Sequence, residues 1–266
     1  MTDRYVVIGN PVGHSKSPWI HAEFARATGQ DIEYGRLEPP LDGFDAAVDR
    51  FRAAGGRGAN VTLPFKPAAF RYCVALSRRA RAAEAVNTLV LDRPQAFGDN
   101  TDGVGLVRDL QTNLGCALEG RRVLLLGAGG AAQGVVQPLL DAGVVSLIVV
   151  NRTAARAETL AARFPGITGG GYALLEGAAF DLVINATSSG LADERPPIPG
   201  SVFAAGALAY DMVYGRDTPF LALARAQGVR VSDGTGMLVE QAAESFFVWR
   251  GVRPPTASVL RTLRRG

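Results

Sequence analysis

The sequence contains few of the residues from which metal sites and disulfides are built. It has two cysteines and two histidines among 266 residues, and Cys73 and Cys116 are far in sequence from each other and from His14 and His21. Zinc sites and disulfide frameworks need several such side chains at close spacings. We therefore expect no bound metal and no disulfide, as in a protein of the reducing cytoplasm.

Long hydrophobic runs are also missing. The apolar run from Tyr5 to Ile8 is short, and no later run reaches the roughly 20 residues that cross a bilayer. Basic residues exceed acidic residues by only three, 28 against 25, and the arginines are scattered. A basic block that could hold nucleic acid is therefore not expected. These features predict a cytoplasmic globular protein that binds neither membranes nor nucleic acid and whose ligands are small anions.

Lysine is scarce. Only Lys16 and Lys66 are lysines, so 26 of the 28 basic residues are arginines. A guanidinium stays protonated, whereas burial can lower the pKa of a lysine far enough for it to exchange a proton during catalysis. A lysine in so arginine-rich a chain invites a chemical explanation, although chance explains a single lysine equally well.

Short runs of β-type residues alternate with segments of helical period along the whole chain, which predicts an α/β protein with largely parallel sheets. Two domains are expected, one formed by residues 1–102 and 238–266, with C-terminal helices packing back on it, and one formed by residues 103–237. The expected strands are 5–8, 59–63, 88–92, 123–126, 146–150, 181–185 and 207–212. The expected helices include 17–27, with Ser17 as its N-cap, 103–114 and 237–251. A further helix is expected where Phe44, Ala47, Val48 and Phe51 recur at three- and four-residue steps and give one apolar face.

The predicted strand at 123–126 runs directly into a glycine-rich loop, Gly127-Ala128-Gly129-Gly130-Ala131-Ala132. A G-x-G-x-x-A segment between a strand and a helix is typical of dinucleotide binding, whereas the glycines alone would indicate only a tight turn. Gly127 permits the turn, Gly129 lets a pyrophosphate approach the backbone, and the helix N-terminus offers free N–H groups. We therefore expect a Rossmann-like domain in residues 103–237, with its cofactor at Gly127, Ala128, Gly129, Gly130 and Ala131.

The end of the next predicted strand distinguishes between cofactors. NAD enzymes usually carry an acidic residue there, about 20 residues on, which binds the ribose hydroxyls. This chain has Asn151, Arg152 and Thr153 instead, with Arg156 one turn later. A carboxylate would repel a 2′-phosphate, whereas two guanidinium groups and a hydroxyl could bind it. NADP is therefore the predicted cofactor, and a solvated basic helix start is the alternative.

Four polar clusters follow predicted strands in the first half of the chain, at 9–18, 60–66, 85–89 and 100–103. Each alone is explained by turn or cap chemistry. Together they gather hydroxyls, amides, one lysine and one aspartate at strand ends, where open α/β sheets bind ligands. Such a set suits a small polyhydroxylated acid.

These clusters, in this order, resemble the signature segments of the shikimate dehydrogenase family, and the resemblance continues through the glycine loop and residues 185–190 to 236–241. It implies NADPH-dependent, reversible reduction of 3-dehydroshikimate to shikimate in aromatic amino acid biosynthesis, with Lys66 and Asp102 in proton transfer. The resemblance also implies that substrate is bound or its pocket shaped by Ser15, Ser17, Asn60, Thr62, Asn87, Tyr214 and Gln241. It implies that the nicotinamide region is lined by Thr187, Met212, Gly234 and Met237.

Departures from the family pattern are modest: Glu84 stands where glycine is frequent, and Ala22 stands where asparagine is frequent. The histidines fall within the N-terminal signature rather than beside the lysine and aspartate, so a catalytic role is not expected for either. Three questions stay open: which of Lys66 and Asp102 is the formal base, whether quinate is a substrate, and whether the chain is a monomer or a homodimer. A non-catalytic NADP-binding regulator is a further alternative.

Overall fold

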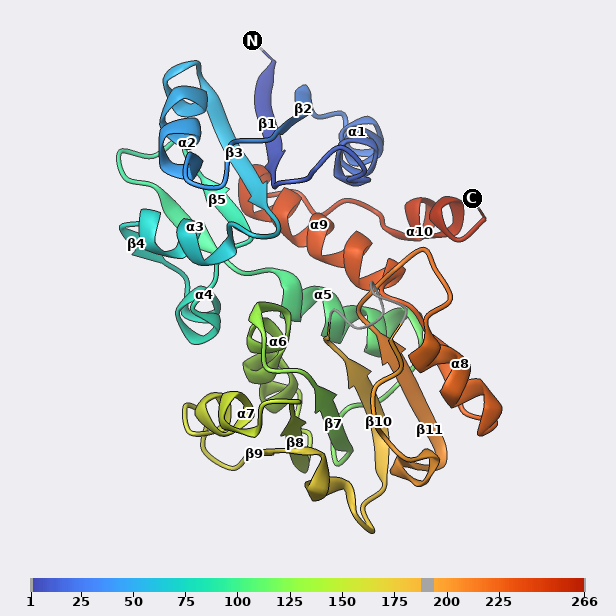
Figure 1. Ribbon diagram of the computed structural model, residues 1–266. Coiled ribbons are helices and arrows are strands. Elements are labelled where there is room, and N and C mark those ends of the chain that lie inside the picture. The colour runs from blue at the N-terminus through green and yellow to red at the C-terminus, as the bar shows by residue number, and fades with distance from the viewer. Residues whose placement is uncertain (1, 188–193, 266) are drawn as a thin grey trace. The chain divides into compact units, whose positions relative to one another are not determined.

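The computed structural model describes residues 2–187 and 194–265, and the chain divides into two compact units. The first consists of residues 1–105 and 239–266, and the second of residues 106–238. Helices α5 (Asp102–Arg108) and α9 (Thr235–Arg250) contain the points at which the chain passes from one unit to the other. Each unit is an α/β sandwich with its own sheet, as Figure 1 shows.

The first unit is built on a six-stranded sheet in the order β2-β1-β3-β5-β6-β4. All strands run the same way except β5, which is antiparallel to both neighbours. The strands are β1 (Asp3–Ile8), β2 (Ile32–Leu37), β3 (Gly56–Val61), β4 (Ala75–Leu76), β5 (Thr88–Val90) and β6 (Phe97–Asp99). The helices are α1 (Ser17–Thr28), α2 (Phe44–Ala53), α3 (Lys66–Tyr72), α4 (Arg78–Ala83) and α10 (Ala257–Leu263), together with most of α9.

One core of this unit lies between β1, β3, β5 and helices α2 and α3. Phe44, Val48 and Phe51 form the apolar face of α2, and they pack with Ile8 of β1 and Phe65, which precedes α3. Figure 1 shows α2 beside β3. Burying this face holds the carboxyl ends of β1 and β3, from which two of the polar clusters extend.

The second unit has a fully parallel sheet in the order β12-β11-β10-β7-β8-β9. Numbered within the unit, this is the 3-2-1-4-5-6 order of a Rossmann fold, read from β9. The strands are β7 (Arg122–Leu126), β8 (Ser146–Val150), β9 (Thr168–Gly170), β10 (Phe180–Asn185), β11 (Phe203–Asp211) and β12 (Arg230–Ser232). The helices are α6 (Gly130–Asp141), α7 (Ala154–Ala161) and α8 (Pro219–Ala226), with short turns of 3₁₀-helix at Tyr172–Leu175 and Gly200–Val202.

The predicted fold class is confirmed, since both sheets are mostly parallel and the second is Rossmann-like. Several details were wrong. Ser17 is the first residue of α1 and not its N-cap, because the N–H of Ile20 already bonds the carbonyl of Lys16. The helix expected over 103–114 is α-helical only to Arg108 and continues as a π-helix, Asp109–Asn113. Strands β2, β4, β6, β9 and β12 were not predicted.

Candidate functional site

Lys66 and Asp102 form an ion pair in the first unit. Lys66 opens α3, Asp102 opens α5, and the lysine Nζ lies 2.5 Å from Oδ2 of the aspartate. The side chain of Asp102 is 8% exposed and that of Lys66 is 19% exposed. The lysine therefore reaches the carboxylate from the more open side, where a substrate hydroxyl could meet its ammonium group.

Asn87 holds the other oxygen of Asp102. Its Nδ2 donates to Asp102 Oδ1 at 2.8 Å and to the hydroxyl of Thr101 at 2.9 Å. Its Oδ1 accepts the backbone N–H of Thr101 at 2.8 Å. Because both carboxylate oxygens receive donors, the plane of the Asp102 carboxylate is fixed.

Gln241 of α9 reaches the side chain of Asn87. Its Oε1 lies 3.4 Å from Nδ2 of Asn87. Gly105 allows the approach of α5 to α9, because a Cβ at this position would lie 2.7 Å from the backbone nitrogen of Gln241. The glycine is thus needed for packing, and the amide of Gln241 comes to the polar cluster as a consequence.

Asn60, at the end of β3, extends the cluster. Its Nδ2 donates to the Ser245 hydroxyl at 2.9 Å and to the backbone oxygen of Asn87 at 3.2 Å. Its Oδ1 receives the hydroxyl of Tyr34 at 2.7 Å and faces Nε2 of His21 at 3.1 Å. Thr62 follows the strand, and its backbone N–H bonds the carbonyl of Ile8, which continues the pairing of β3 with β1.

Ser15 and Ser17 lie at the N-terminus of α1. The Ser15 hydroxyl accepts the backbone N–H of Ser17, and the guanidinium of Arg36 donates to the Ser15 carbonyl at 2.8 Å. Burial raises the pKa of Tyr34 well above its usual value, and the adjacent Ser17 hydroxyl opposes this shift. Two hydroxyls at a helix N-terminus, with an arginine nearby, suit a carboxylate.

The structure thus brings together most of the predicted substrate residues. One hydrogen-bonded cluster contains Lys66, Asp102, Asn87, Gln241 and Asn60. The Ser17 hydroxyl lies beside Tyr34, which bonds Asn60. Tyr214 belongs to the second unit, where its ring is partly exposed, and its assignment to the substrate stays a prediction.

Sequence reasoning did not assign five members of the cluster to the site: His21, Tyr34, Thr88, Thr101 and Ser245. Ser245 could have been found, because it follows Gln241 by one helical turn and therefore lies on the same face of α9. Its hydroxyl donates back to the Gln241 carbonyl at 3.0 Å. Tyr34 gave no signal, because it lies on a strand that was not predicted.

The glycine loop of the second unit fits a pyrophosphate. Gly127 has φ +104°, and a Cβ there would lie 3.2 Å from the Ala186 carbonyl. A Cβ on Gly129 or Gly130 would meet nothing within 4 Å, so the space before α6 is open. No side chain of the described residues caps α6, which leaves its first N–H groups facing that space. Ala132, in the first turn of α6, is fully buried. Ala128 and Ala131 complete the loop.

The loop after β8 carries the residues that were predicted to bind the 2′-phosphate. Arg152, Thr153 and Arg156 are exposed, and neither arginine has an ion-pair partner within the described residues. Thr153 is the N-cap residue of α7, but its hydroxyl caps nothing there. Asn151 donates from its side chain to the Thr153 carbonyl at 3.0 Å and shapes the turn. The residue types therefore fit a 2′-phosphate.

The residues assigned to the nicotinamide region meet at the ends of β10 and β11. Asn185 Oδ1 accepts the Thr187 hydroxyl at 2.7 Å, and its backbone carbonyl accepts the N–H of Met212 at 2.9 Å. A Cβ on Gly234 would lie 2.3 Å from the Met212 carbonyl, so only glycine allows this contact. Met237 is buried and bonds the Tyr210 hydroxyl through its backbone N–H.

Some expectations concern features outside this cluster. The motif at 185–190 includes Ser188, Ser189 and Gly190, which lie outside the described residues. Within residues 2–187 and 194–265, no group of three metal-ligating side chains could hold an ion, and no helix is long and apolar enough to cross a membrane. Cys73 and Cys116 are both free thiols.

Comparison with known proteins identifies the relatives of this chain. Its sequence matches the shikimate dehydrogenase substrate binding domain over residues 7–89, shikimate / quinate 5-dehydrogenase over residues 109–192, and the shikimate 5'-dehydrogenase C-terminal domain over residues 234–264. It is 58% identical to shikimate dehydrogenase (NADP(+)) of Dechloromonas aromatica, with 99% of this chain and 98% of the relative covered.

Two solved structures are similar over their whole length. The Ael1 enzyme of Pseudomonas putida superposes with a TM-score of 0.95 at 49% identity, covering 98% of both chains. Shikimate 5-dehydrogenase of Thermus thermophilus, solved in complex with NADP(H) and shikimate, superposes with a TM-score of 0.89 at 35% identity, covering 99% of both chains.

Proposed function

The chain belongs to the shikimate dehydrogenase family, and we infer that it catalyses the reversible, NADP-dependent reduction of 3-dehydroshikimate to shikimate. This reaction is a step in the biosynthesis of chorismate and the aromatic amino acids. The observation that supports it most directly is the ion pair of Lys66 and Asp102, held by Asn87 in the substrate unit.

We assign proton transfer to this pair. NADPH, when bound, supplies the hydride for the substrate carbonyl carbon, so the protein must supply a proton to the carbonyl oxygen as it becomes a hydroxyl. The ammonium group of Lys66 can donate an N–H to that oxygen. Asp102 holds the ammonium in place at 2.5 Å and balances its charge. In the reverse direction the pair takes up the proton of the hydroxyl.

The remaining substrate residues position the ring. Ser15 and Ser17 are proposed to bind the carboxylate at the N-terminus of α1, where the helix dipole favours an anion. Asn60, Thr62, Asn87 and Gln241 are proposed to contact ring hydroxyls or to shape the pocket. The carboxylate and the reacting carbon of the substrate would then be held at opposite ends of one polar cluster.

The cofactor residues divide into two groups. Gly127, Gly129 and Gly130 are proposed to hold the pyrophosphate at α6, and Arg152, Thr153 and Arg156 the 2′-phosphate. Thr187, Met212, Gly234 and Met237 are proposed to line the nicotinamide region. The absence of an acidic side chain at the end of β8 supports NADP over NAD.

A spectrophotometric assay tests this function. NADP reduction is followed with shikimate or quinate as the substrate, and each is repeated with NAD. We expect turnover with shikimate and NADP. Preference for quinate would support the second candidate, which the match of residues 109–192 to shikimate / quinate 5-dehydrogenase brings into consideration. Ligand binding without turnover would instead indicate a regulator.

Cytoplasmic location, and a monomer or homodimer, are further proposals. The two free thiols agree with a reducing compartment.

A further inference from the structure

His21 lies within the polar cluster of the first unit, although the proposed reaction gives it no task. We propose that His21 is a positioning residue that, together with Tyr34, fixes the side-chain amide of Asn60 and through it the carboxylate of Asp102. The proposal rests on the function above, because Asp102 matters only if it takes part in proton transfer.

The first step is the contact of His21 with Asn60. His21 is fully buried on α1, and its ring stacks on Tyr34 with the centroids 4.3 Å apart and the planes within 4°. Nε2 of His21 lies 3.1 Å from Asn60 Oδ1, and the hydroxyl of Tyr34 donates to the same oxygen at 2.7 Å. The two stacked rings thus present neighbouring donors to one amide oxygen.

The direction of the Asn60 amide decides the tautomer of His21. Nδ2 of Asn60 lies 3.2 Å from the backbone oxygen of Asn87, which is an acceptor. A reversed amide would place two carbonyl oxygens against each other at this distance. Oδ1 must therefore face His21, and the imidazole must carry its proton on Nε2 in order to donate to it.

The second step connects Asn60 with Asp102. Asn60 donates to Ser245, whose hydroxyl lies 2.8 Å from that of Thr88. Thr88 donates to Asn87 Oδ1 at 2.8 Å, which leaves Nδ2 of Asn87 to donate to Asp102. A reversed Asn87 would turn its oxygen toward the carboxylate and repel it. The backbone N–H of Thr101 also donates to Asn87 Oδ1 and helps to orient this amide. Asn60 acts on Asn87 by position, because its Nδ2 also donates to the backbone oxygen of Asn87 at 3.2 Å.

A second observation indicates that position 21 requires the hydrogen-bond donor of an imidazole and not only an aromatic ring. Nδ1 of His21 is buried and has no hydrogen-bond partner among the described protein residues. The ring also lies within 6.1 Å, centroid to centroid, of Phe24, Phe246 and Trp249. A phenyl group would suit these surroundings and would bury no acceptor, so packing alone does not explain a histidine here. The N–H on Nε2, which donates to Asn60, explains the histidine.

The test compares His21→Phe with His21→Gln. The phenyl ring keeps the stacking and loses the donor, whereas the glutamine amide can return an N–H to Asn60. We expect His21→Phe to lower kcat with shikimate about tenfold and to change its pH profile, with an unchanged KM for NADP. Its thermal unfolding midpoint should equal or exceed that of the unmodified protein, and His21→Gln should recover part of kcat.

The matched control is Phe24→Leu, which alters the packing against the same ring without removing a hydrogen bond. It should lower the unfolding midpoint and leave kcat unchanged. Unchanged kcat and pH profile in His21→Phe would overturn the positioning role. Equal losses of stability and kcat in all three variants would show that His21 only packs the core.

A measurement without turnover separates this inference from the proposed function. Nitrogen NMR of protein labelled in histidine should show a neutral His21 with its proton on Nε2. A proton on Nδ1 would overturn the inference even if the enzyme were fully active. If the unmodified protein failed to oxidise shikimate, the proposed function would fall, and the tautomer would still decide whether His21 fixes Asn60.

Discussion

The first unit, which contains most of the proposed substrate residues (the substrate unit), and the second, which contains the proposed cofactor residues (the nucleotide unit), present their ligand groups in opposite ways. In the first unit, the side chains of Lys66, Asp102, Asn87 and Asn60 bond one another and are largely buried. In the second, the phosphate groups would meet open backbone at Gly129 and exposed arginines that hold no acidic partner within the described residues.

This difference has consequences for function. A network of buried, mutually bonded groups is already ordered before the ligand binds, so a change at one member should disturb the others. Exposed arginines must lose side-chain entropy when they bind a phosphate, and changes there should act locally and add. The first arrangement suits positioning for chemistry, and the second suits recognition of a cofactor that binds and leaves.

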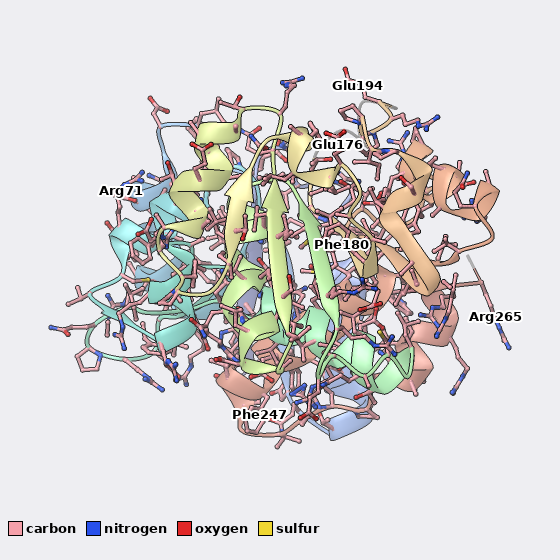
Figure 2. All side chains as sticks on the ribbon, turned by 90° about the horizontal axis from the view of Figure 1, so that it is seen from below. Arg71, Glu176, Phe180, Glu194, Phe247 and Arg265 are labelled. Carbon is pink, nitrogen blue, oxygen red and sulfur yellow. The ribbon has the colours of Figure 1, made fainter. Side chains whose placement is uncertain are left out.

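The largest effect is expected for Lys66→Ala, which tests whether the ordered network serves catalysis. Removing the group that exchanges the proton should lower kcat by roughly 100-fold to 10,000-fold, while shikimate and NADP binding are largely kept. Steady-state kinetics measure kcat, and titration calorimetry measures the affinities for shikimate and NADP. Arg71→Ala is the control, because Arg71 is exposed in the last turn of the same helix (Figure 2). Full kcat in Lys66→Ala would remove this residue from the mechanism.

The next effect tests the open backbone of the nucleotide unit. Gly129 has φ −86°, which alanine adopts easily, and an added Cβ meets no protein atom within 4 Å. Gly129→Ala should therefore fold with unchanged stability, but its methyl group would occupy the space of the pyrophosphate and weaken NADP binding by about tenfold or more.

Gly171→Ala is the matched control for this change. Gly171 has nearly the same backbone angles, φ −86° and ψ 177°, and its added Cβ would make an ordinary contact of 3.6 Å with Ala154. Calorimetric titration with NADP compares the two variants. Equal affinity in both would show that the pyrophosphate does not lie against Gly129.

A smaller effect is expected at the proposed 2′-phosphate clamp. Arg152→Ala should raise the KM for NADP by roughly tenfold, which corresponds to about 1.4 kcal/mol, and should leave the KM for NAD nearly unchanged. Combining it with Arg156→Ala should give the sum of the two free-energy changes. Arg225→Ala removes an exposed arginine of α8 and serves as the control. Equal effects on NADP and NAD would refute the clamp.

The last prediction concerns acid stability, to which His21 of the first unit and Asp211 of the second contribute with opposite signs. Burial lowers the pKa of His21 to about 3, so below about pH 6.5 the unfolded chain binds a proton that the folded chain does not. Acid should therefore cost the first unit about 2 kcal/mol between pH 6.5 and pH 5. In the second unit, burial raises the pKa of Asp211, so acid relieves a buried charge there.

Tryptophan fluorescence isolates this effect, because Trp19 and Trp249, the only tryptophans, both belong to the first unit. Urea unfolding followed in this way at pH 5 and pH 7.5 should show a lower midpoint in acid, and His21→Phe should remove most of the difference. An equal midpoint at both pH values would contradict the low pKa.

Local sequence patterns predicted the features that depend on local forces. The spacing of Phe44, Val48 and Phe51 indicated α2, and continuous apolar runs indicated β7, β8 and β10, because burial of a repeating face leaves a periodic trace. The strand β4, which has only two residues, left no such trace. Ser17 was assigned as the N-cap of α1, but the N-cap is Lys16. The hydroxyl that accepts a backbone N–H at this turn is that of Ser15.

By itself, the sequence determined the α/β class, the glycine loop ahead of α6, the lack of an acid after β8, and, through its family resemblance, Lys66 and Asp102 as the catalytic candidates. Tertiary structure alone decided how these groups are held. Asn60 and Ser245 are 185 residues apart, and their contact depends on the packing of α9 in the first unit. The sense of an amide and the tautomer of His21 follow from which donors surround them in space, and such contacts leave no periodic pattern along a chain.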